Sequence, residues 1–266
     1  MTGRLARVYL RFVISGAVVI MIWYLIWFLV TPPSYILPSP SAVAAEFLNH
    51  TGYYSKQLME TTLTSAAGLV LGIVMGAVLA FVSALFPSFS PAVETGSVAL
   101  RTIPIVALAP IITMWFGTEA SARTVVSGII CFFPFFSSLR LGLDRVESTS
   151  LLIFKIYGAT RWQTFVRLRL PSAVPLFTSA IPMSTTLAVL GALVAEFCGS
   201  DVGLGLVVLH GLYLLNASIL FVAMILSAVL GILFYLGGRT AEVLFERYLK
   251  ATISVQGEQT EIGGLA

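Results

Sequence analysis

The chain has 266 residues, of which 58% are hydrophobic and only 10% are charged, with a net charge of +3. Because soluble domains carry about 25% charged residues, a chain this poor in charge cannot cover a water-facing surface, and the lipid bilayer must be its solvent. No dense Lys/Arg run with interleaved aromatic residues is present, which excludes nucleic acid as a partner.

The N-terminal segment is predicted to be a retained membrane span. Three arginines precede an apolar run over residues 12–30. This run of roughly 19 residues can cross a bilayer and exceeds the usual apolar core of a signal peptide, about 7–15 residues. A proline-rich external loop is expected over residues 31–57, with a short helix over residues 42–48 capped by Ser39 or Ser41.

The next three spans are predicted over residues 58–86, 98–116 and 124–143. Gly68, Gly72 and Gly76 share one face of the second span, a pattern that favours close helix contact, although membrane helices also tolerate glycine without such a role. Pro104 and Pro110 are expected to kink the third span. A connection over residues 87–102 is predicted to begin inside the cell, and a short external turn covers residues 117–123.

The central segment over residues 144–175 is the most polar internal part of the chain. It is too polar to span a membrane and too apolar to be a plain solvated loop. We therefore predict one or two short helices at the membrane surface that present a patch to another protein. Its positively charged residues are Arg145, Lys155, Arg161, Arg167 and Arg169.

The last two spans are predicted over residues 174–197 and 218–236. Glu196, at the external end of the fifth, either lines or gates a path or reaches the outer interface beside Asp201. Ser184 and Thr185 either line a polar path or bond back to their own helix. A glycine-rich external segment covers residues 199–205, a basic amphipathic end residues 239–250, and a disordered tail residues 251–266.

Charge placement predicts the orientation. With the N-terminus inside, every Lys and Arg except Lys56 and Arg123 falls on an inner segment. The positive-inside rule then places both termini and the central loop in the cytoplasm. The expected fold is all-α, a helix bundle of about six spans that forms one transmembrane domain over residues 1–250.

The sequence contains no pattern for catalysis or for metal binding. His50 and His210 are far apart, and Cys131 and Cys198 have no ligand spacing. No Gly-Lys pair occurs, so the chain has no P-loop for ATP.

The central loop resembles a family motif. Gly158, nine residues, and then Leu168-Arg169-Leu170-Pro171 are similar to the G-x9-I-x-L-P core of the EAA loop, which marks permease subunits of bacterial binding-protein-dependent ABC importers. The acidic and alanine positions of that loop are replaced here, at residues 152–154. Further stretches resemble the branch for nitrate, taurine, alkanesulfonates and vitamin precursors, namely residues 37–41, 101–104, 109–110, 115–117, 195–197 and 203–205.

The resemblance implies a type I importer permease in the bacterial inner membrane. Two permease subunits, as a homodimer or an unlike pair, would form the path, a cytoplasmic ABC ATPase would bind ATP, and an external binding protein would deliver the solute. The permease itself would need no cofactor. The residues expected to couple to the ATPase are Phe154, Tyr157, Gly158, Ala159, Arg161, Trp162, Phe165, Leu170 and Pro171. The expected path or gate residues are Ser184, Thr185, Glu196, Gly203 and Gly205.

Three other classes remain open at this point. An ion-coupled secondary carrier would use broken helices at the midplane, but no inverted repeat is visible and intramembrane charges are few. A membrane enzyme would need a cluster of His, Asp or Glu at one membrane face, which the sequence lacks. A structural or assembly protein is the third.

Overall fold

The computed structural model describes the backbone of residues 2–117 and 120–263, and the side chains of residues 14, 16–117 and 120–247. Over this part of the chain all regular structure is helical, which confirms the predicted all-α class. The helices are α1 (Thr2–Val30), α2 (Pro40–Asn49), α3 (Thr51–Leu85), α4 (Ser90–Thr102), α5 (Ile105–Phe116), α6 (Ala120–Asp144), α7 (Ser148–Ile156), α8 (Arg161–Thr164), the π-helical turn η1 (Phe165–Arg169), α9 (Leu170–Ser179), α10 (Ile181–Phe197), α11 (Leu204–Tyr213) and α12 (Ala217–Gly263).

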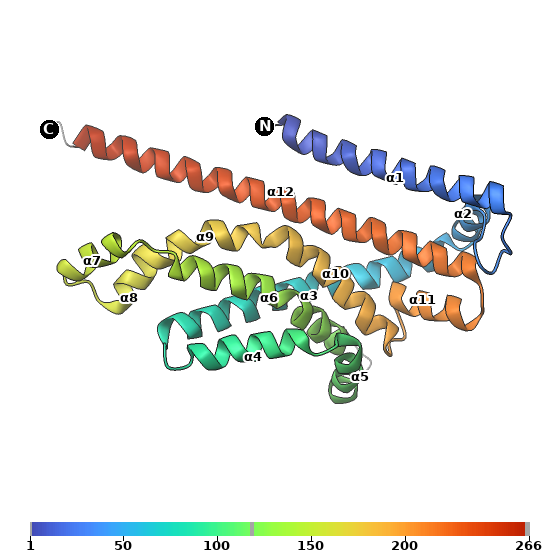
Figure 1. The fold of residues 1–266 in the computed structure, drawn as a ribbon, viewed down its shortest axis with the longest axis horizontal. Helices are drawn as coiled ribbons and strands as arrows, with labels where there is room; N and C mark the ends of the chain where they lie inside the picture. The colour runs from blue at the N-terminus through green and yellow to red at the C-terminus, as the bar shows by residue number, and fades with distance from the viewer. Residues whose placement is uncertain (1, 118–119, 264–266) are drawn as a thin grey trace.

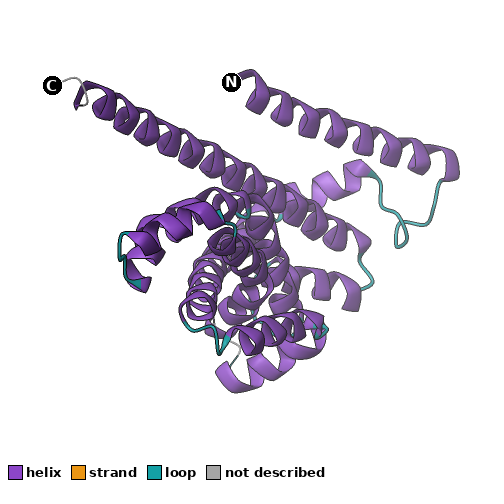
Figure 2. Cartoon of the chain, turned by 60° about the vertical axis from the view of Figure 1, so that its left-hand side comes forward, coloured by secondary structure: helices purple, strands orange, loops and turns teal. Residues whose placement is uncertain are grey.

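The helices run between two ends of an elongated bundle. Figure 1 shows α7 and α8 at one end and α2 and α11 at the other, with α12 extending along the whole length. Figure 2 shows in a second view that α1 stands apart from the bundle. Its Trp23 ring stacks on Phe221 of α12, with ring centroids 5.2 Å apart. The Trp23 indole also donates a hydrogen bond to the carbonyl of Pro38.

The six predicted spans are not confirmed. Within the described residues, α3, α6 and the Ala217–Arg247 part of α12 are long and apolar enough to cross a membrane. Two further pairs are bent, α4 with α5 by 101° and Arg161–Ser179 with α10 by 55°, so the total is three spans, or up to five. Of the first predicted span, the part over Gly16–Val30, where side chains are described, is an apolar helix that forms the C-terminal half of α1.

The bends follow from proline chemistry. Ile103 precedes Pro104 and has the extended conformation that a following proline favours, so α4 ends and α5 begins in a new direction. The third predicted span is therefore two helices, and most of the predicted connection over residues 87–102 is α4. At the second bend, Pro182 occupies the first turn of α10, where its missing N–H costs no hydrogen bond.

The last helix also differs from the prediction. We expected the sixth span to end at Leu236, because a Gly-Gly pair follows it, but α12 continues through both glycines to Gly263. Residues 251–263 are thus helical where a disordered tail was expected, and residues 264–266 lie outside the described residues.

Close packing of α3 against α6 confirms the glycine pattern. A Cβ added at Gly68 would overlap the Ser127 side chain, and one added at Gly72 would overlap the Cys131 sulfur. At Gly76 an added Cβ would lie 2.8 Å from the Phe135 Cβ and 2.9 Å from the Phe132 carbonyl oxygen. Because lipid supplies no hydrophobic drive for helix pairing, close approach through small residues is what holds these two helices together.

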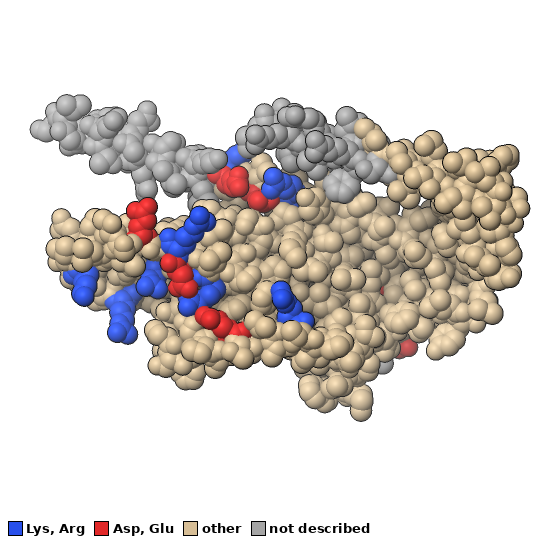
Figure 3. Space-filling view, viewed as in Figure 1, with Lys and Arg blue, Asp and Glu red and all other residues tan. Residues whose placement is uncertain are grey.

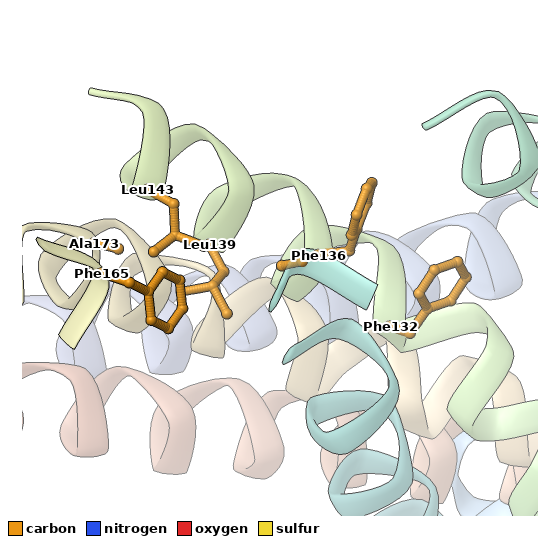
Figure 4. Close-up of a cluster of buried hydrophobic side chains, with 7 residues drawn as sticks. Phe132, Phe136, Leu139, Leu143, Phe165 and Ala173 are labelled. Atoms are coloured by element: carbon orange, nitrogen blue, oxygen red, sulfur yellow. The ribbon is translucent and has the colours of Figure 1, made fainter. Parts of the chain in front are cut away.

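A hydrophobic cluster ties the central loop to this helix pair (Figure 4). Phe165 of η1 is 6% exposed and meets the Phe81 ring of α3 edge to face, with centroids 5.6 Å apart. Gly142 of α6 lies against Ala173 of α9, where an added Cβ would come within 2.8 Å of the Ala173 Cβ. The other labelled members, all on α6, are Phe132, Phe136, Leu139 and Leu143.

The α3–α6 contact generates a stability prediction. In an open helix, Gly→Ala stabilises by about 0.5–1 kcal/mol, whereas an extra methyl in a filled contact costs about 1–3 kcal/mol. We expect Gly76→Ala to destabilise the protein, since its Cβ meets backbone atoms of α6 that cannot move aside. Thermal unfolding in detergent would show a lower melting temperature. Gly237→Ala is the control, because an added Cβ there has no atom within 4 Å, and the same loss in both variants would contradict this explanation.

Candidate functional site

The central loop consists of two short helices joined by a tight turn. Local hydrogen bonds define both the end of the first helix, α7, and the start of the second, α8. After α7, the N–H of Gly158 donates to the Lys155 carbonyl at 3.1 Å and the N–H of Ala159 donates to the Phe154 carbonyl at 2.9 Å. This pair of bonds is the Schellman motif, which needs a left-handed residue. Gly158 supplies it with a φ of +69°. The glycine of the family-like motif therefore ends α7.

The next helix begins with a capping box. The Thr160 hydroxyl accepts from the Gln163 N–H at 3.2 Å, and the Gln163 side chain accepts from the Thr160 N–H at 2.8 Å. The two bonds satisfy N–H groups that a helix start would otherwise leave open. The predicted pair of short helices is present as α7 and α8, and the chain then passes through η1 into α9 without a break.

The loop residues fall into two groups by exposure. The side chains of Ile156, Tyr157 and Trp162 are 72%, 85% and 61% exposed, and we call these three the loop face. Phe165 instead points into the cluster of Figure 4, and the Trp162 ring stacks on it at 5.8 Å. Of the other expected coupling residues, Arg161 and Pro171 are exposed, whereas Phe154, Ala159 and Leu170 are half-buried.

Glu196 lies at the opposite end of the bundle and is fully buried, at 0% exposure. Its Oε2 accepts hydrogen bonds from the Thr61 hydroxyl at 2.8 Å and from the Gly205 N–H at 3.0 Å. It therefore does not extend to the outer interface beside Asp201. The carboxylate joins α10 to α3 and to the first turn of α11, where a negative charge is stabilised by the helix dipole.

Side chains of α3 complete this junction. The Thr61 hydroxyl accepts from the Leu204 N–H at 2.8 Å, and the Gln57 side chain accepts from the Gly203 N–H at 2.7 Å. These bonds satisfy the open N–H groups at the start of α11. Gly203 has a φ of +103°, and a Cβ there would overlap the Glu196 carboxyl group. The structure thus brings three predicted path residues, Glu196, Gly203 and Gly205, into one junction.

A buried arginine lies beside the junction. Arg123 was expected in an external turn, but its side chain belongs to α6 and is 6% exposed. Its Nη1 donates to the Ser200 hydroxyl at 2.8 Å, and its Nη2 lies 3.5 Å from Glu60 Oε2. The arginine is buried because carboxylate and hydroxyl partners compensate its charge. Sequence reasoning missed Gln57, Thr61 and the placement of Arg123, since no spacing links them to Glu196.

Ser184 and Thr185 lie elsewhere, on the part of α10 near α12. Thr185 donates its hydroxyl back to the Pro182 carbonyl at 2.8 Å, which is one of the two fates expected for it. Ser184 is fully buried, and its hydroxyl has no hydrogen-bond partner among the described side chains. An added Cβ at Gly238 would lie 2.7 Å from the Thr185 hydroxyl oxygen. Both side chains thus face the protein interior.

Three adjoining cavities of about 390, 480 and 450 Å³ form what we call the α10–α12 groove. The first and second share Leu193 and Ser227, and the second and third share Thr186 and Tyr235, so the groove runs from Gly205 to Glu242. Gly205 is the one expected path residue that lines it. The sequence did not single out Ser227 or Tyr235, because isolated polar residues in apolar helices carry no positional signal.

Comparison with known proteins identifies a matching family. The family described as "Binding-protein-dependent transport system inner membrane component" matches residues 68–242. A probable ABC transporter permease protein of Haemophilus influenzae is 29% identical over 82% of this chain and 89% of its own length. The formylaminopyrimidine transport permease protein ThiX of Halalkalibacterium halodurans is 32% identical over 64% of this chain and 69% of its own. The riboflavin transport system permease protein RibX of Chloroflexus aurantiacus is 29% identical over 81% of each chain.

A solved structure shares the fold. An inward-facing structure of the MetNI methionine ABC transporter matches with a TM-score of 0.59 and covers 76% of this chain and 96% of its own. The sequence identity is 18%, so this likeness concerns the arrangement of helices.

The Glu196 junction generates a stability prediction. Thr61→Val keeps the shape of the side chain but leaves the Leu204 N–H and Glu196 with one partner fewer, which costs about 1–3 kcal/mol for a buried group. We expect a lower melting temperature in detergent. Thr62→Val is the matched control on the next residue, since the Thr62 hydroxyl only bonds back to the Leu58 carbonyl. Equal melting temperatures for the two variants would show that the Thr61 hydrogen bonds do not stabilise the protein.

Proposed function

The chain belongs to the family of binding-protein-dependent transport system inner membrane components, as the transmembrane subunit of an ATP-driven importer, and we propose that its central loop couples the membrane path to a separate ATPase. The family match extends over residues 68–242, which include the central loop and the Glu196 junction. It favours the importer over the ion-coupled carrier. ATP is bound and hydrolysed by the partner, because this chain has no P-loop.

The loop face supports the coupling proposal. Tyr157 and Trp162 are aromatic side chains held in the open, and aromatic residues of this kind are enriched at protein interfaces. The Schellman turn and the capping box make the loop one stiff unit. Phe165 fixes that unit to α3 and α6, and η1 runs directly into α9 and α10. A push on the loop face is therefore delivered to the helices as a rigid-body movement.

A second permease subunit completes the path in this proposal. The α10–α12 groove is apolar along most of its wall and carries a few hydroxyls, Thr186, Ser227 and Tyr235. Such a surface can contact either the bilayer or the helices of another subunit. A path between two subunits needs one wall from each subunit, and the groove would supply the wall on this chain. Glu196, Gly203 and Gly205 then act as the rigid external support of that wall. The partner is a second copy or an unlike permease.

The charge distribution supports an orientation with the loop in the cytoplasm. Figure 3 shows most of the charged side chains visible on this face near the end with α7 and α8, while the opposite end is nearly free of them. By the positive-inside rule, the distribution of Lys and Arg supports a cytoplasmic location of the loop and of both termini in this proposal. An external binding protein then delivers the solute to the end that carries α2 and α11. Relatives named for transport of riboflavin, formylaminopyrimidine and aliphatic sulfonates support a vitamin, a vitamin precursor or a sulfonate as the solute.

The turn at Gly158 generates the first functional prediction. Gly158→Val forces a β-branched residue into a left-handed conformation at a cost of roughly 1–2 kcal/mol, which displaces the loop face. We expect reconstituted vesicles with the ATPase and binding protein to hydrolyse ATP without matching solute uptake. Gly158→Asn is the control, since asparagine tolerates this conformation. Immunoblotting would confirm equal membrane levels, and wild-type uptake by the valine variant would refute the coupling role.

The loop face generates the second functional prediction. Tyr157→Ala removes an 85% exposed aromatic ring and should weaken binding of the ATPase subunit about tenfold, as expected for a side chain worth roughly 1.4 kcal/mol at an interface. Tyr213→Ala is the matched control, because Tyr213 is 79% exposed on α11 at the opposite end. Co-purification at graded ATPase concentration measures the difference. Equal affinity of both variants would assign the ATPase contact to another surface.

A further inference from the structure

The side of the central loop that faces the bundle borders a cavity. A cavity of about 470 Å³ lies between the end of α3 and the loop. Its apolar wall comes from both sides: Ala84 and Leu85 belong to the last turn of α3, Pro87 follows it, and Leu151 and Phe165 belong to α7 and η1. Its polar wall is made by Lys155, Arg161 and Arg169, with the Thr164 hydroxyl beside them. We call it the basic pocket.

The three cations of the basic pocket are uncompensated. Among the described side chains, no Asp or Glu lines the pocket, and none forms an ion pair with Lys155, Arg161 or Arg169. Arg140, close to the same end, shows the contrast, since it pairs with both Glu94 and Asp144. Three positive charges that converge on one cavity repel one another, so the pocket is built for an anion.

The position of the pocket favours a lipid anion over a soluble one. Leu85 is the last residue of α3, which is long and apolar enough to cross the membrane, so the pocket lies at the depth of the headgroups. The adjacent side chains of Phe86 and Phe89 are 57% and 60% exposed, and aromatic rings concentrate at this depth. An occupant with a phosphate and an acyl chain satisfies both walls of the pocket.

We propose that the basic pocket binds the headgroup of an anionic phospholipid, with the phosphate between Lys155, Arg161 and Arg169 and the glycerol and upper acyl chain along Leu85, Pro87 and Leu151. Basic pockets between membrane helices suit such headgroups. The bound lipid joins the loop to the end of α3 from the membrane side, and it neutralises the mutual repulsion of the three cations, all of which lie on the loop.

This proposal extends the coupling role and concerns a different set of side chains. The loop face of Ile156, Tyr157 and Trp162 is directed outward, whereas Lys155 and Arg169 line the pocket. Variants of Lys155 and Arg169 therefore test lipid binding while leaving the proposed ATPase contact intact. Arg161 is left unchanged in the test, because it also belongs to the expected coupling residues.

The experiment titrates phosphatidylglycerol into the purified full-length chain in detergent micelles and follows the melting temperature, with phosphatidylcholine and inorganic phosphate in parallel. We expect phosphatidylglycerol to raise the melting temperature and the other two to have little effect. In the double variant Lys155→Gln/Arg169→Gln, the apparent affinity for phosphatidylglycerol should fall about 30-fold, because each cation near the headgroups contributes a factor of roughly five.

The control removes the same charge from the same end. Arg145→Gln/Arg167→Gln leaves the pocket lining untouched and should keep wild-type affinity. An equal loss of phosphatidylglycerol affinity in both double variants would mean that the lipid is attracted by the overall positive charge of this end, and it would overturn the proposed site. Stabilisation by inorganic phosphate alone, or equally by phosphatidylcholine, would also overturn it.

The ATPase provides a separate outcome. If Lys155→Gln/Arg169→Gln keeps its response to phosphatidylglycerol but no longer binds the ATPase, the pocket receives an acidic segment of that partner and the lipid proposal fails. If Tyr157→Ala binds the ATPase normally while the lipid titration behaves as expected, the coupling proposal fails and the lipid site stands.

Discussion

The fold depends on how closely α3 and α6 approach each other. The three α3 glycines leave no room for a side chain against Ser127, Cys131 and Phe135, so the two backbones form one rigid pair. The same seam receives α10, because a Cβ on Gly191 would lie 2.6 Å from the Ser127 Cα, and the Ser127 hydroxyl donates to the Ala188 carbonyl. In lipid, where apolar burial between helices gains little, this contact of small residues, together with that hydrogen bond, holds the three helices together.

The two ends of the bundle that this rigid pair connects differ in how their charged side chains are paired. At the end with α11, Arg123 lies 3.5 Å from Glu60, and the Glu196 side chain accepts a hydrogen bond from the Gly205 N–H, which lets a short helix begin inside the protein. At the loop end, Lys155, Arg161 and Arg169 have no such partners among the described side chains. The first arrangement locks helices to each other. The second leaves charge available for a neighbour, whether lipid or protein.

The loop illustrates how local and tertiary constraints agree. Gly158 and Thr160 define the ends of two helices by hydrogen bonds within a few residues, so the turn would form with little help from the bundle. Phe165 then decides where that turn is placed, since its ring fills a space between α3 and α6. In the coupling role proposed for this loop both are needed, because a stiff turn without an anchor would move independently of the bundle.

Local chemistry in the sequence was enough to determine the all-α class, the glycine face of α3 and the helical loop, because each rests on periodicity or on hydrogen bonds between near neighbours. The count of six spans is not confirmed, since a proline can kink a helix or end it, and only packing decided that α4 and α5 would diverge by 101°. Likewise Glu196 was visible as an expensive charge, but Thr61, Gln57 and Arg123 became its neighbours only when α3, α6, α10 and α11 met. Contacts between residues far apart in the chain leave no mark in a single sequence, so the tertiary structure alone assigned them.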